Sequence, residues 1–452
     1  MSKSKIHIKA AIIGNNDTGK STLIGQLMLK TGGIDKKTWD QITKEANLIS
    51  ECICCDTIYR YAWILDTLHT ERYRNMSINI SIRKLQTENF YYTIIDTPGN
   101  KQFINKSIRG ISQADIVVLI VSSAQGEFES SMSSWGHTKD HAFISFSLGI
   151  RQIVVCVSKM DHQTCDWSEN RYNTIKNILS EYLQSIGFTS ENIQFVPVSG
   201  IYGDNLLNPS LRLPWYNGPT FIETLNKITP PIKHYENKPL RLPILQTYNI
   251  NRIGVVSIGC IQTGILKPGM MVTLAPLGIK KRIKSIEMHN ENLEVAFPGD
   301  FIGLNIDYCK IKSGMILCDP ECDPIQECTS FIAEITVLNC LNRFCVGYSP
   351  LVFCHTARSS CRFSDLLMRI NKKTGIVSEF KPSFLTNGDR AIVELVPVRP
   401  MCVETFIENQ NLGRIVIKDF NKIVAVGIIR EVKVKEILIG EDRKCEIKGE
   451  ES

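Results

Sequence analysis

The first half of the chain alternates short apolar runs with longer amphipathic stretches. Between residues 5 and 237, each run is rich in β-branched side chains and precedes a segment with helical periodicity. This rhythm predicts βαβ units, in which helices cover a mainly parallel sheet. Runs that are apolar throughout are expected to be central strands, because both of their faces are buried. The predicted strands cover residues 8–13, 92–95, 116–121, 153–157 and 195–198.

The pattern changes at Thr229-Pro230-Pro231, where a polar, proline-bearing segment begins. Beyond it, short alternating segments recur at close spacing between turn signals such as Lys267-Pro268-Gly269. Such a pattern is typical of antiparallel barrels. Residues 362–370 have a helix-like pattern and are predicted to be the one helical exception. We therefore expect an α/β domain over residues 5–237, a first β-barrel over 238–325, a second over 326–438 and a flexible tail over 439–452.

Composition indicates a soluble globular protein. With 452 residues, 43% of them apolar and 22% charged, the chain is too long for one core and is not disordered, collagen-like or a coiled-coil rod. No signal peptide is evident, and the longest apolar run, residues 116–121, is far too short to span a bilayer. We expect a cytoplasmic protein without membrane association. The small excess of 52 Lys+Arg over 46 Asp+Glu names no partner.

The cysteines and the histidine pair of this chain could suggest metal sites, but we interpret both as structural. The 16 cysteines are expected to be mostly buried thiols in a reducing compartment. Cys52-Ile53-Cys54-Cys55 has no second pair at zinc-ligand spacing nearby, so we interpret it as part of a disordered loop. His137 and His141 share a helix face without a third ligand, and we expect them on a solvated helix surface.

The strongest chemical signal follows the first predicted strand. The sequence there is Gly14-Asn15-Asn16-Asp17-Thr18-Gly19-Lys20-Ser21, which satisfies G-x-x-x-x-G-K-[ST] between a strand and an amphipathic helix. In this context the glycines let backbone N–H groups surround a β-phosphate, and Lys20 bridges the β- and γ-phosphate oxygens. Ser21 is predicted to bind Mg²⁺, and Thr22 is counted among the nucleotide-binding residues.

Three further motifs come at the ends of predicted strands. Asp96-Thr97-Pro98-Gly99 offers a carboxylate for Mg²⁺ and the Gly99 N–H for a γ-phosphate. Ser158-Lys159-Met160-Asp161 selects guanine, because the Asp161 carboxylate can accept hydrogen bonds from N1 and N2 while the Lys159 stem lies over the ring. Ser199-Gly200 is expected to contact the guanine O6 through the backbone, and Ile201 is grouped with it. Together the motifs predict a site for GTP or GDP with Mg²⁺.

These residues resemble those of translational GTPases, with the closest resemblance to eukaryotic elongation factor 1-alpha. The resemblance covers nearly the whole chain. It implies a G domain followed by two β-barrels, and a GTP-bound form that delivers aminoacyl-tRNA to the ribosome and hydrolyses GTP. It also implies a guanine-nucleotide exchange factor as a partner, and we expect a monomer. The motifs that carry it, beyond those above, are residues 32–36, 61–66, 113–115, 126–129, 263–270, 287–289, 354–357 and 400–404.

The chain departs from the family pattern around the γ-phosphate. Asn100 stands where the family has the histidine that positions the attacking water. Lys20 and Gly99 keep their predicted catalytic positions, so we predict slowed hydrolysis with nucleotide binding intact. The alternative is that the Asn100 amide still orients the water. Asn16 and Met76 replace the valine and isoleucine of an apolar gate beside this residue.

Other departures concern the metal, the switch segment and the base. Ser77 falls on the family's Mg²⁺-binding threonine and keeps the hydroxyl ligand. Asn75 replaces a glycine in the same segment, which limits φ and predicts altered switching. Ser158 replaces the asparagine that in the family contacts the base and ties its loop to the P-loop, and this predicts weaker guanine binding.

The resemblance assigns Glu287, His289, Asp300 and Phe301 to a pocket for the aminoacyl end of the tRNA. Phe301 replaces an asparagine there, and it either stacks on or blocks the aminoacyl group or is a repacked barrel position. Two functions therefore stay open. The first is an elongation factor that delivers aminoacyl-tRNA to the ribosomal A site. The second is a divergent paralogue that holds GTP as a switch or scaffold in ribosome rescue, termination or another pathway.

Overall fold

A computed structural model describes residues 5–49, 60–133, 136–231, 235–250, 254–289, 291–306, 308, 310–338, 343–371, 374–420 and 422–434, with residues 47–49 described by their backbone alone. The predicted loop at Cys52–Cys55 and the predicted tail at 439–452 lie outside these ranges. Within them, no helix is both long and apolar enough to cross a membrane.

The first unit contains a six-stranded sheet in the order β2-β3-β1-β4-β5-β6. All neighbouring strands pair in parallel except β2, which is antiparallel to β3. The central strand β4 is buried along its whole length, as its uninterrupted apolar sequence predicts. The strands are β1 (Ile6–Ile13), β2 (Ser81–Gln86), β3 (Phe90–Asp96), β4 (Ile116–Ser122), β5 (Ile153–Ser158) and β6 (Ile193–Pro197).

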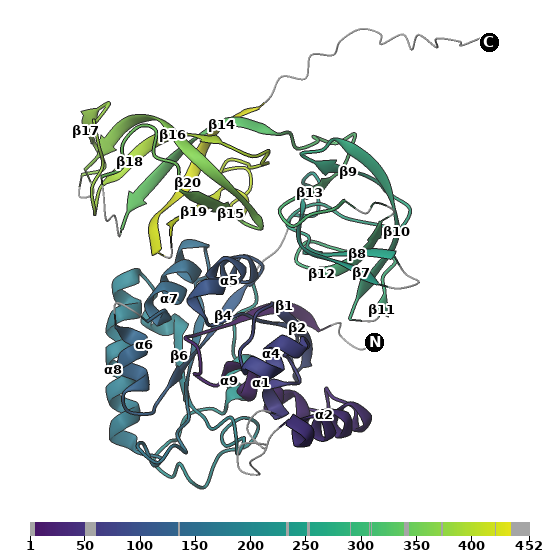
Figure 1. Cartoon of the computed structure of the whole chain (residues 1–452), viewed down its shortest axis with the longest axis vertical. Coiled ribbons are helices and arrows are strands. Elements are labelled where there is room, and N and C mark those ends of the chain that lie inside the picture. Colours follow the sequence, from purple (N-terminus) through teal and green to yellow (C-terminus); the bar gives the residue numbers. More distant parts are fainter. Residues whose placement is uncertain are drawn as a thin grey trace, which may run out of the picture.

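Helices cover both faces of this sheet (Figure 1). Apolar side chains of α1 and α9 pack on one face, and those of α5, α7 and α8 pack on the other. Because the strands are parallel, their carboxyl ends meet at one edge of the sheet. The helices cover the two faces and leave this edge open, and ligands bind there in such folds. The helices are α1 (Lys20–Lys30), α2 (Lys36–Ile49), α4 (His69–Arg74), α5 (Ile104–Ile111), α6 (Glu127–Met132), α7 (Thr138–Ser147), α8 (Glu169–Ile186) and α9 (Phe221–Asn226), with short 3₁₀ turns η1 (Lys101–Phe103) and η2 (Ser190–Asn192).

The second unit is a closed antiparallel barrel. Its six strands close through the pairing of β9 with β10, and the short β11 pairs antiparallel with the end of β10. The barrel core is formed by inward-facing aliphatic side chains such as Leu242, Leu274 and Ile302. The strands are β7 (Leu242–Ile250), β8 (Gly254–Cys260), β9 (Met271–Ala275), β10 (Ile279–Met288), β11 (Glu291–Asn292), β12 (Phe301–Ile306) and β13 (Ile316–Cys318).

The third unit is a second closed antiparallel barrel, which lies over α5 and α7 in Figure 1. Six strands close through the pairing of β15 with β16, and β17 is added at the end of β16. The predicted fold class, an α/β domain followed by two antiparallel barrels, is confirmed. The strands are β14 (Cys328–Val337), β15 (Leu351–Cys354), β16 (Ala357–Ile370), β17 (Val377–Phe380), β18 (Arg390–Pro397), β19 (Arg414–Asp419) and β20 (Lys422–Val434).

The predicted helix over residues 362–370 is wrong, because this segment belongs to strand β16. β16 pairs with β18, and the register shifts twice, between Phe363 and Asp365 and between Leu366 and Met368. Each shift inserts an extra residue, as a β-bulge does. The buried Phe363 and Leu366 are therefore three residues apart. Their spacing imitates one face of a helix.

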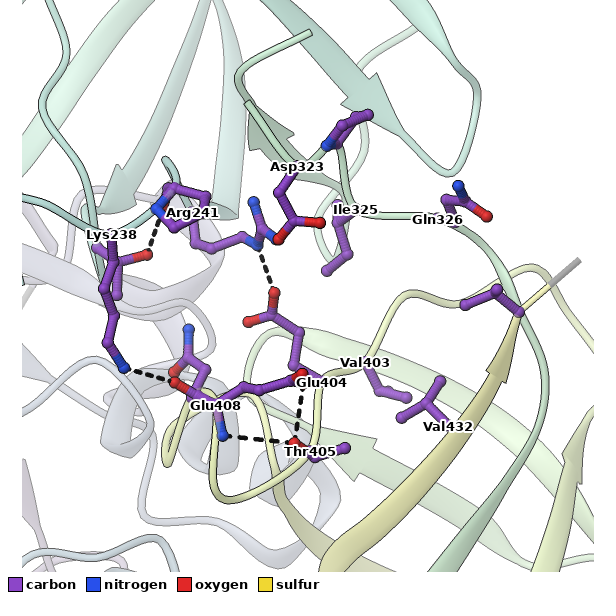
Figure 2. Close-up of a pocket in the computed structure, with 15 residues that line it drawn as sticks. Lys238, Arg241, Asp323, Ile325, Gln326, Val403, Glu404, Thr405, Glu408 and Val432 are labelled. Carbon is purple, nitrogen blue, oxygen red and sulfur yellow. Dashed lines mark hydrogen bonds and ion pairs between the residues drawn. The ribbon is translucent and has the colours of Figure 1, made fainter. Parts of the chain in front are cut away.

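A buried arginine joins the two barrels (Figure 2). Arg241, at the start of the first barrel, donates through Nε to Glu404 of the second barrel, and through Nη2 to Asp323 of the connection between them at 2.8 Å. A cavity of about 520 Å³ lies beside these groups. Removing one partner of a buried ion pair leaves an uncompensated charge. The contact therefore ties the orientation of one barrel to the other.

Candidate nucleotide-binding site

The loop between β1 and α1 has the backbone that the phosphate motif requires. Gly14 has φ 146°, and a Cβ at this position would clash with the carbonyl oxygen of Ile120. Gly19 has φ 86° and precedes the first residue of α1. The N-terminus of α1 therefore points its unpaired N–H groups at the loop, as in anion sites of this kind.

The side chain of Lys20 is buried beneath this loop and donates from Nζ to the backbone oxygen of Asn15 at 2.6 Å. Burial lowers the pKa of Lys20, while the negative charges of Asp96, Asp17 and Asp66 act in the opposite direction. The buried ammonium therefore lies in the field of three acidic side chains but contacts a neutral carbonyl oxygen. A phosphate would be a stronger partner for it than the carbonyl oxygen that it now contacts.

Two hydroxyls and two carboxylates converge beside Lys20. Ser21 Oγ donates to Asp96 Oδ2 at 2.8 Å and lies 3.0 Å from Ser77 Oγ. Ser77 Oγ in turn donates to Asp66 Oδ1 at 2.7 Å. The second oxygen of Asp96, Oδ1, is buried and has no hydrogen-bond partner among the described residues. Clustered hydroxyl and carboxylate oxygens are the ligands that Mg²⁺ prefers, and the residues present fit this ion.

Burial makes the carboxyl groups of Asp66 and Asp96 weaker acids than usual. It raises the pKa of Asp66 to about 7 and that of Asp96 to about 6, although the hydrogen bond from Ser77 and the charge of Lys20 partly oppose this. Two neighbouring carboxylates are costly to ionise together in a low-dielectric site. A divalent cation held by Ser21, Ser77 and Asp96 would reduce this cost.

Asp66 and Glu71 belong to this site, and sequence reasoning gave them no role. Glu71 is buried and accepts from the backbone N–H groups of Ile78 and Asn79, both at 2.8 Å, which fixes the segment that presents Ser77. Asp66 ends one of the motifs behind the family resemblance, but no residue spacing marks it as a partner of Ser77. Asn75 adopts φ 48°, a left-handed conformation that asparagine tolerates better than most residues.

Asn100 is engaged at both ends of its side-chain amide. Its Nδ2 donates to the sulfur of Met76 at 3.1 Å, and its Oδ1 accepts from the backbone N–H of Gln102 at 3.0 Å. Asn16 and Met76 both line the phosphate cavity of about 290 Å³, and the Asn16 amide donates to Asp17 Oδ2. The amide of Asn100 therefore bridges two segments and caps η1.

A second cavity, of about 190 Å³, adjoins the phosphate cavity and is lined by most of the residues predicted to bind the base, so we call it the base cavity. Asp161 Oδ1 is buried without a hydrogen-bond partner among the described residues. An unsatisfied carboxylate oxygen fits the N1 and N2 donors of guanine. Ser199, predicted at the same pocket, accepts the Tyr202 N–H on its hydroxyl. The cavity is lined by Gly19, Thr22, Ser158, Lys159, Asp161, His162, Gly200 and Ile201.

His141 is a further residue whose place was not expected. The predicted solvated helix surface at His137 and His141 is wrong, because these side chains are buried, His141 with 1% exposure. His141 Nδ1 accepts the backbone N–H of Gly14 at 3.3 Å. Burial lowers the pKa of His141 to about 3, with the positive charge of Lys20 adding to this effect, so the ring is neutral and able to accept. Helix α7 thus supports the phosphate loop.

Three of the four residues assigned to an aminoacyl pocket lie at the interface between the first unit and the first barrel. Phe301 is 4% exposed and packs with Ile80 and Ile95. His289 Nε2 lies 2.9 Å from Thr93 Oγ1, and Asp300 Oδ1 lies 3.8 Å from His7 Nδ1. Glu287, on β10, is exposed. Their role in binding an aminoacyl group stays a prediction.

The fold and the site together define a P-loop GTP-binding protein in which a GTPase domain precedes two β-barrels. Residues 5–231 match the elongation factor Tu GTP binding domain, residues 254–318 match elongation factor Tu domain 2, and residues 330–430 match the GTP-eEF1A C-terminal domain-like family.

Whole proteins match with the same arrangement. The chain is 42% identical to elongation factor 1-alpha of Tetrahymena pyriformis, over 96% of this chain and 99% of that protein. It is 41% identical to elongation factor 1-alpha of Serendipita indica, over 96% of each. The chain therefore belongs to the elongation factor 1-alpha family, whose members are translational GTPases.

Solved structures share the fold at lower sequence identity. The GTP-bound Ski7 GTPase-like domain of S. cerevisiae superposes with a TM-score of 0.78 at 18% identity, covering 94% of this chain and 97% of that one. The bacterial selenocysteine-specific elongation factor EF-Sec superposes with a TM-score of 0.65 at 21% identity, covering 94% of this chain and 58% of that one. At these identities the likeness concerns the fold alone.

Proposed function

We propose that this protein is an elongation factor that binds GTP, delivers aminoacyl-tRNA to the ribosomal A site and hydrolyses GTP to GDP and phosphate. The observation that supports this most is the convergence of phosphate, metal and base groups at one site in a chain that aligns along 96% of its length with elongation factor 1-alpha. We further propose that it acts as a cytoplasmic monomer with a guanine-nucleotide exchange factor as partner.

Each part of the site has a proposed role. The backbone of residues 14–19, with Lys20 and Thr22, holds the phosphates. Asp161 selects guanine, with Gly200 and Ile201 beside it in the base cavity and Ser199 preceding them in the chain. Ser21, Ser77 and Asp96 hold Mg²⁺, with Asp66 placed to orient Ser77. The ion, when bound, supplies positive charge to the β- and γ-phosphates. Gly99 lies against Lys20, where its N–H can meet a γ-phosphate.

We propose that hydrolysis is slow, because the residue next to the γ-phosphate position is Asn100. Its amide must leave both Met76 and the Gln102 N–H before it can turn toward a water. An amide is also a poor general base. The loss of a positioned acid–base group commonly lowers a rate by about 10²–10⁴-fold.

Single-turnover GTP cleavage on ribosomes tests this step directly. The histidine variant, Asn100→His, is expected to cleave about 10²-fold faster or more than the natural chain. Nucleotide affinity, measured in the same preparation, is expected to stay the same, because Asn100 does not line the base cavity. Equal cleavage rates would show that the Asn100 amide orients water adequately.

The second candidate is a GTP-holding switch or scaffold that serves ribosome rescue, termination or another pathway. The engagement of Asn100 by Met76 favours it, since a protein that only holds GTP has no need of a free water-positioning group. A protection assay separates the two functions. The GTP-loaded protein is incubated with charged tRNA, and hydrolysis of the aminoacyl ester is followed by filter binding. Protection supports delivery, and failure to protect any charged tRNA removes it.

A further inference from the structure

The base cavity fixes how a guanine can lie in it. Asp161 Oδ1 is its buried, unpartnered acceptor and takes the N1 and N2 donors of the Watson–Crick edge. Gly19, Thr22 and Lys159 line both the base cavity and the phosphate cavity, and Gly19 and Thr22 belong to the phosphate loop and α1, so the ribose and phosphates lie on their side. The remaining edge of the base, with O6 and N7, then faces Ser158 and the backbone of Gly200 and Ile201.

The hydroxyl of Ser158 is already committed to the protein. It donates to the backbone oxygen of Thr18 at 2.6 Å and is within 3.0 Å of the backbone oxygen of Val121. A serine hydroxyl has one hydrogen to donate, and these two carbonyls share it. N7 of guanine is an acceptor and requires a donor. Turning the hydroxyl toward N7 would leave a buried carbonyl oxygen with one bond fewer, which is unfavourable.

Three other polar side chains line this edge or its neighbourhood: Thr22, which also lines the phosphate cavity, Lys159 and His162. Lys159 Nζ is held by both carboxylate oxygens of Glu127, at 2.8 and 3.0 Å. His162 is exposed, and its Nδ1 accepts the backbone N–H of Thr164 at 3.3 Å. The backbone N–H groups of Gly200 and Ile201 are then left for O6.

We infer that this protein recognises guanine by its Watson–Crick edge and O6 and leaves N7 unread, so that it binds guanine nucleotides lacking the N7 acceptor as tightly as GTP. The inference rests on the proposed binding of GTP and adds a specificity to it. Its ligand class is the guanine nucleotides in which N7 is replaced by a C–H group of the same shape.

A substitution at Ser158 provides a protein that can donate a hydrogen bond to N7, for comparison with the natural chain. An asparagine amide has two N–H donors, so in Ser158→Asn one can keep the bond to the Thr18 carbonyl while the other reaches N7. One neutral hydrogen bond is worth about twofold to tenfold in affinity. The matched control is Ser158→Thr, which keeps a single O–H donor.

The experiment measures dissociation constants by titration calorimetry for GTP, 7-deaza-GTP and ITP with the full chain in Mg²⁺. In 7-deaza-GTP a C–H replaces N7 without a change of shape, and ITP lacks the 2-amino group that Asp161 reads. We expect the natural chain and Ser158→Thr to bind GTP and 7-deaza-GTP within about twofold of each other, and Ser158→Asn to prefer GTP by about threefold or more. ITP is expected to bind all three proteins more weakly.

The natural chain alone decides the question, so a poorly folding variant does not obscure it. A preference of the natural chain for GTP over 7-deaza-GTP beyond about twofold overturns the inference and leaves the proposed function standing. A chain that binds neither GTP nor 7-deaza-GTP contradicts the proposed function itself. The two failures are therefore distinguishable in one set of titrations.

Discussion

Replacing Asp66 by asparagine changes the charge of the metal site while keeping the shape of the side chain. Asp66 is 4% exposed, and burial is the main reason why its pKa rises from 3.8 to about 7. The charges of Asp96 and Glu71 raise the pKa further, and the hydrogen bond from Ser77 opposes them. In the nucleotide-free protein this carboxyl is therefore ionised only above neutral pH.

The sign of the effect follows from linkage. Because the folded state holds the proton more tightly than the unfolded state, Asp66 contributes stability below pH 3.8, and this contribution is lost as the pH rises through about 7. The difference between the two pKa values corresponds to about 4 kcal/mol. An asparagine has no charge to bury, and its amide oxygen still accepts from Ser77. We expect Asp66→Asn to raise the free energy of unfolding at pH 8 by up to about 4 kcal/mol, and by much less at pH 5.

Guanidinium unfolding of the nucleotide-free, Mg²⁺-free protein at pH 5 and pH 8 measures this difference. The control is Asp40→Asn, which removes an exposed carboxylate on α2 and is expected to change neither value by more than about 0.5 kcal/mol. In Asp66→Asn, Mg²⁺ is expected to increase GTP affinity less than it does in the natural chain. The reasoning would be refuted if Asp66→Asn were no more stabilised over the natural chain at pH 8 than at pH 5. The Asp66 carboxyl would then be ionised in the folded protein at no cost.

Two further variants test other buried contacts. His141→Ala removes the acceptor of the Gly14 N–H and leaves that donor buried, so we expect nucleotide affinity, measured by titration, to fall by about 5- to 100-fold. His141→Asn, whose amide oxygen can accept, should recover part of it, and full affinity in His141→Ala would contradict a supporting role. Arg241→Met leaves the largely buried Glu404 without its partner and is expected to cost up to about 3 kcal/mol in chemical unfolding. The double variant Arg241→Met, Glu404→Met should regain most of this loss, and a double variant no better than the single one would argue against an unpaired charge as the cause.

The fold was predictable because its signals are local. An uninterrupted apolar run such as residues 116–121 leaves no solvent-facing side, as expected of the central strand that it forms. The phosphate loop was equally predictable, since Gly14 and Gly19 stand where the backbone needs positive φ. Strand β16 escaped prediction because two bulges, which arise from pairing with β18, break its period of two. Pairing is a tertiary property, and no pattern within the segment reveals it.

Site residues that act through tertiary contacts were also beyond sequence reasoning. His141 supports Gly14 from a helix more than 100 residues away in the chain. Ser77 is presented to Asp66 by a segment that Glu71 holds through the backbone N–H groups of Ile78 and Asn79. Asn100 was singled out from the motif, but its bond to Met76 depends on how two segments fold together. In each case residue type was visible in the sequence and the partner was not.

The two candidate functions differ in what they demand of the interface between the GTPase domain and the first barrel. Phe301 is buried there, and Lys9 of β1 reaches across to donate to the backbone oxygen of Gly299 at 3.1 Å. If Phe301, His289 and Asp300 receive an aminoacyl group, these contacts must open first, whereas a protein that only holds GTP can keep them closed. A cysteine pair introduced across this interface is therefore expected to abolish ester protection of charged tRNA when oxidised and to leave GTP affinity unchanged. Unimpaired protection with the interface locked would show that the aminoacyl end binds elsewhere.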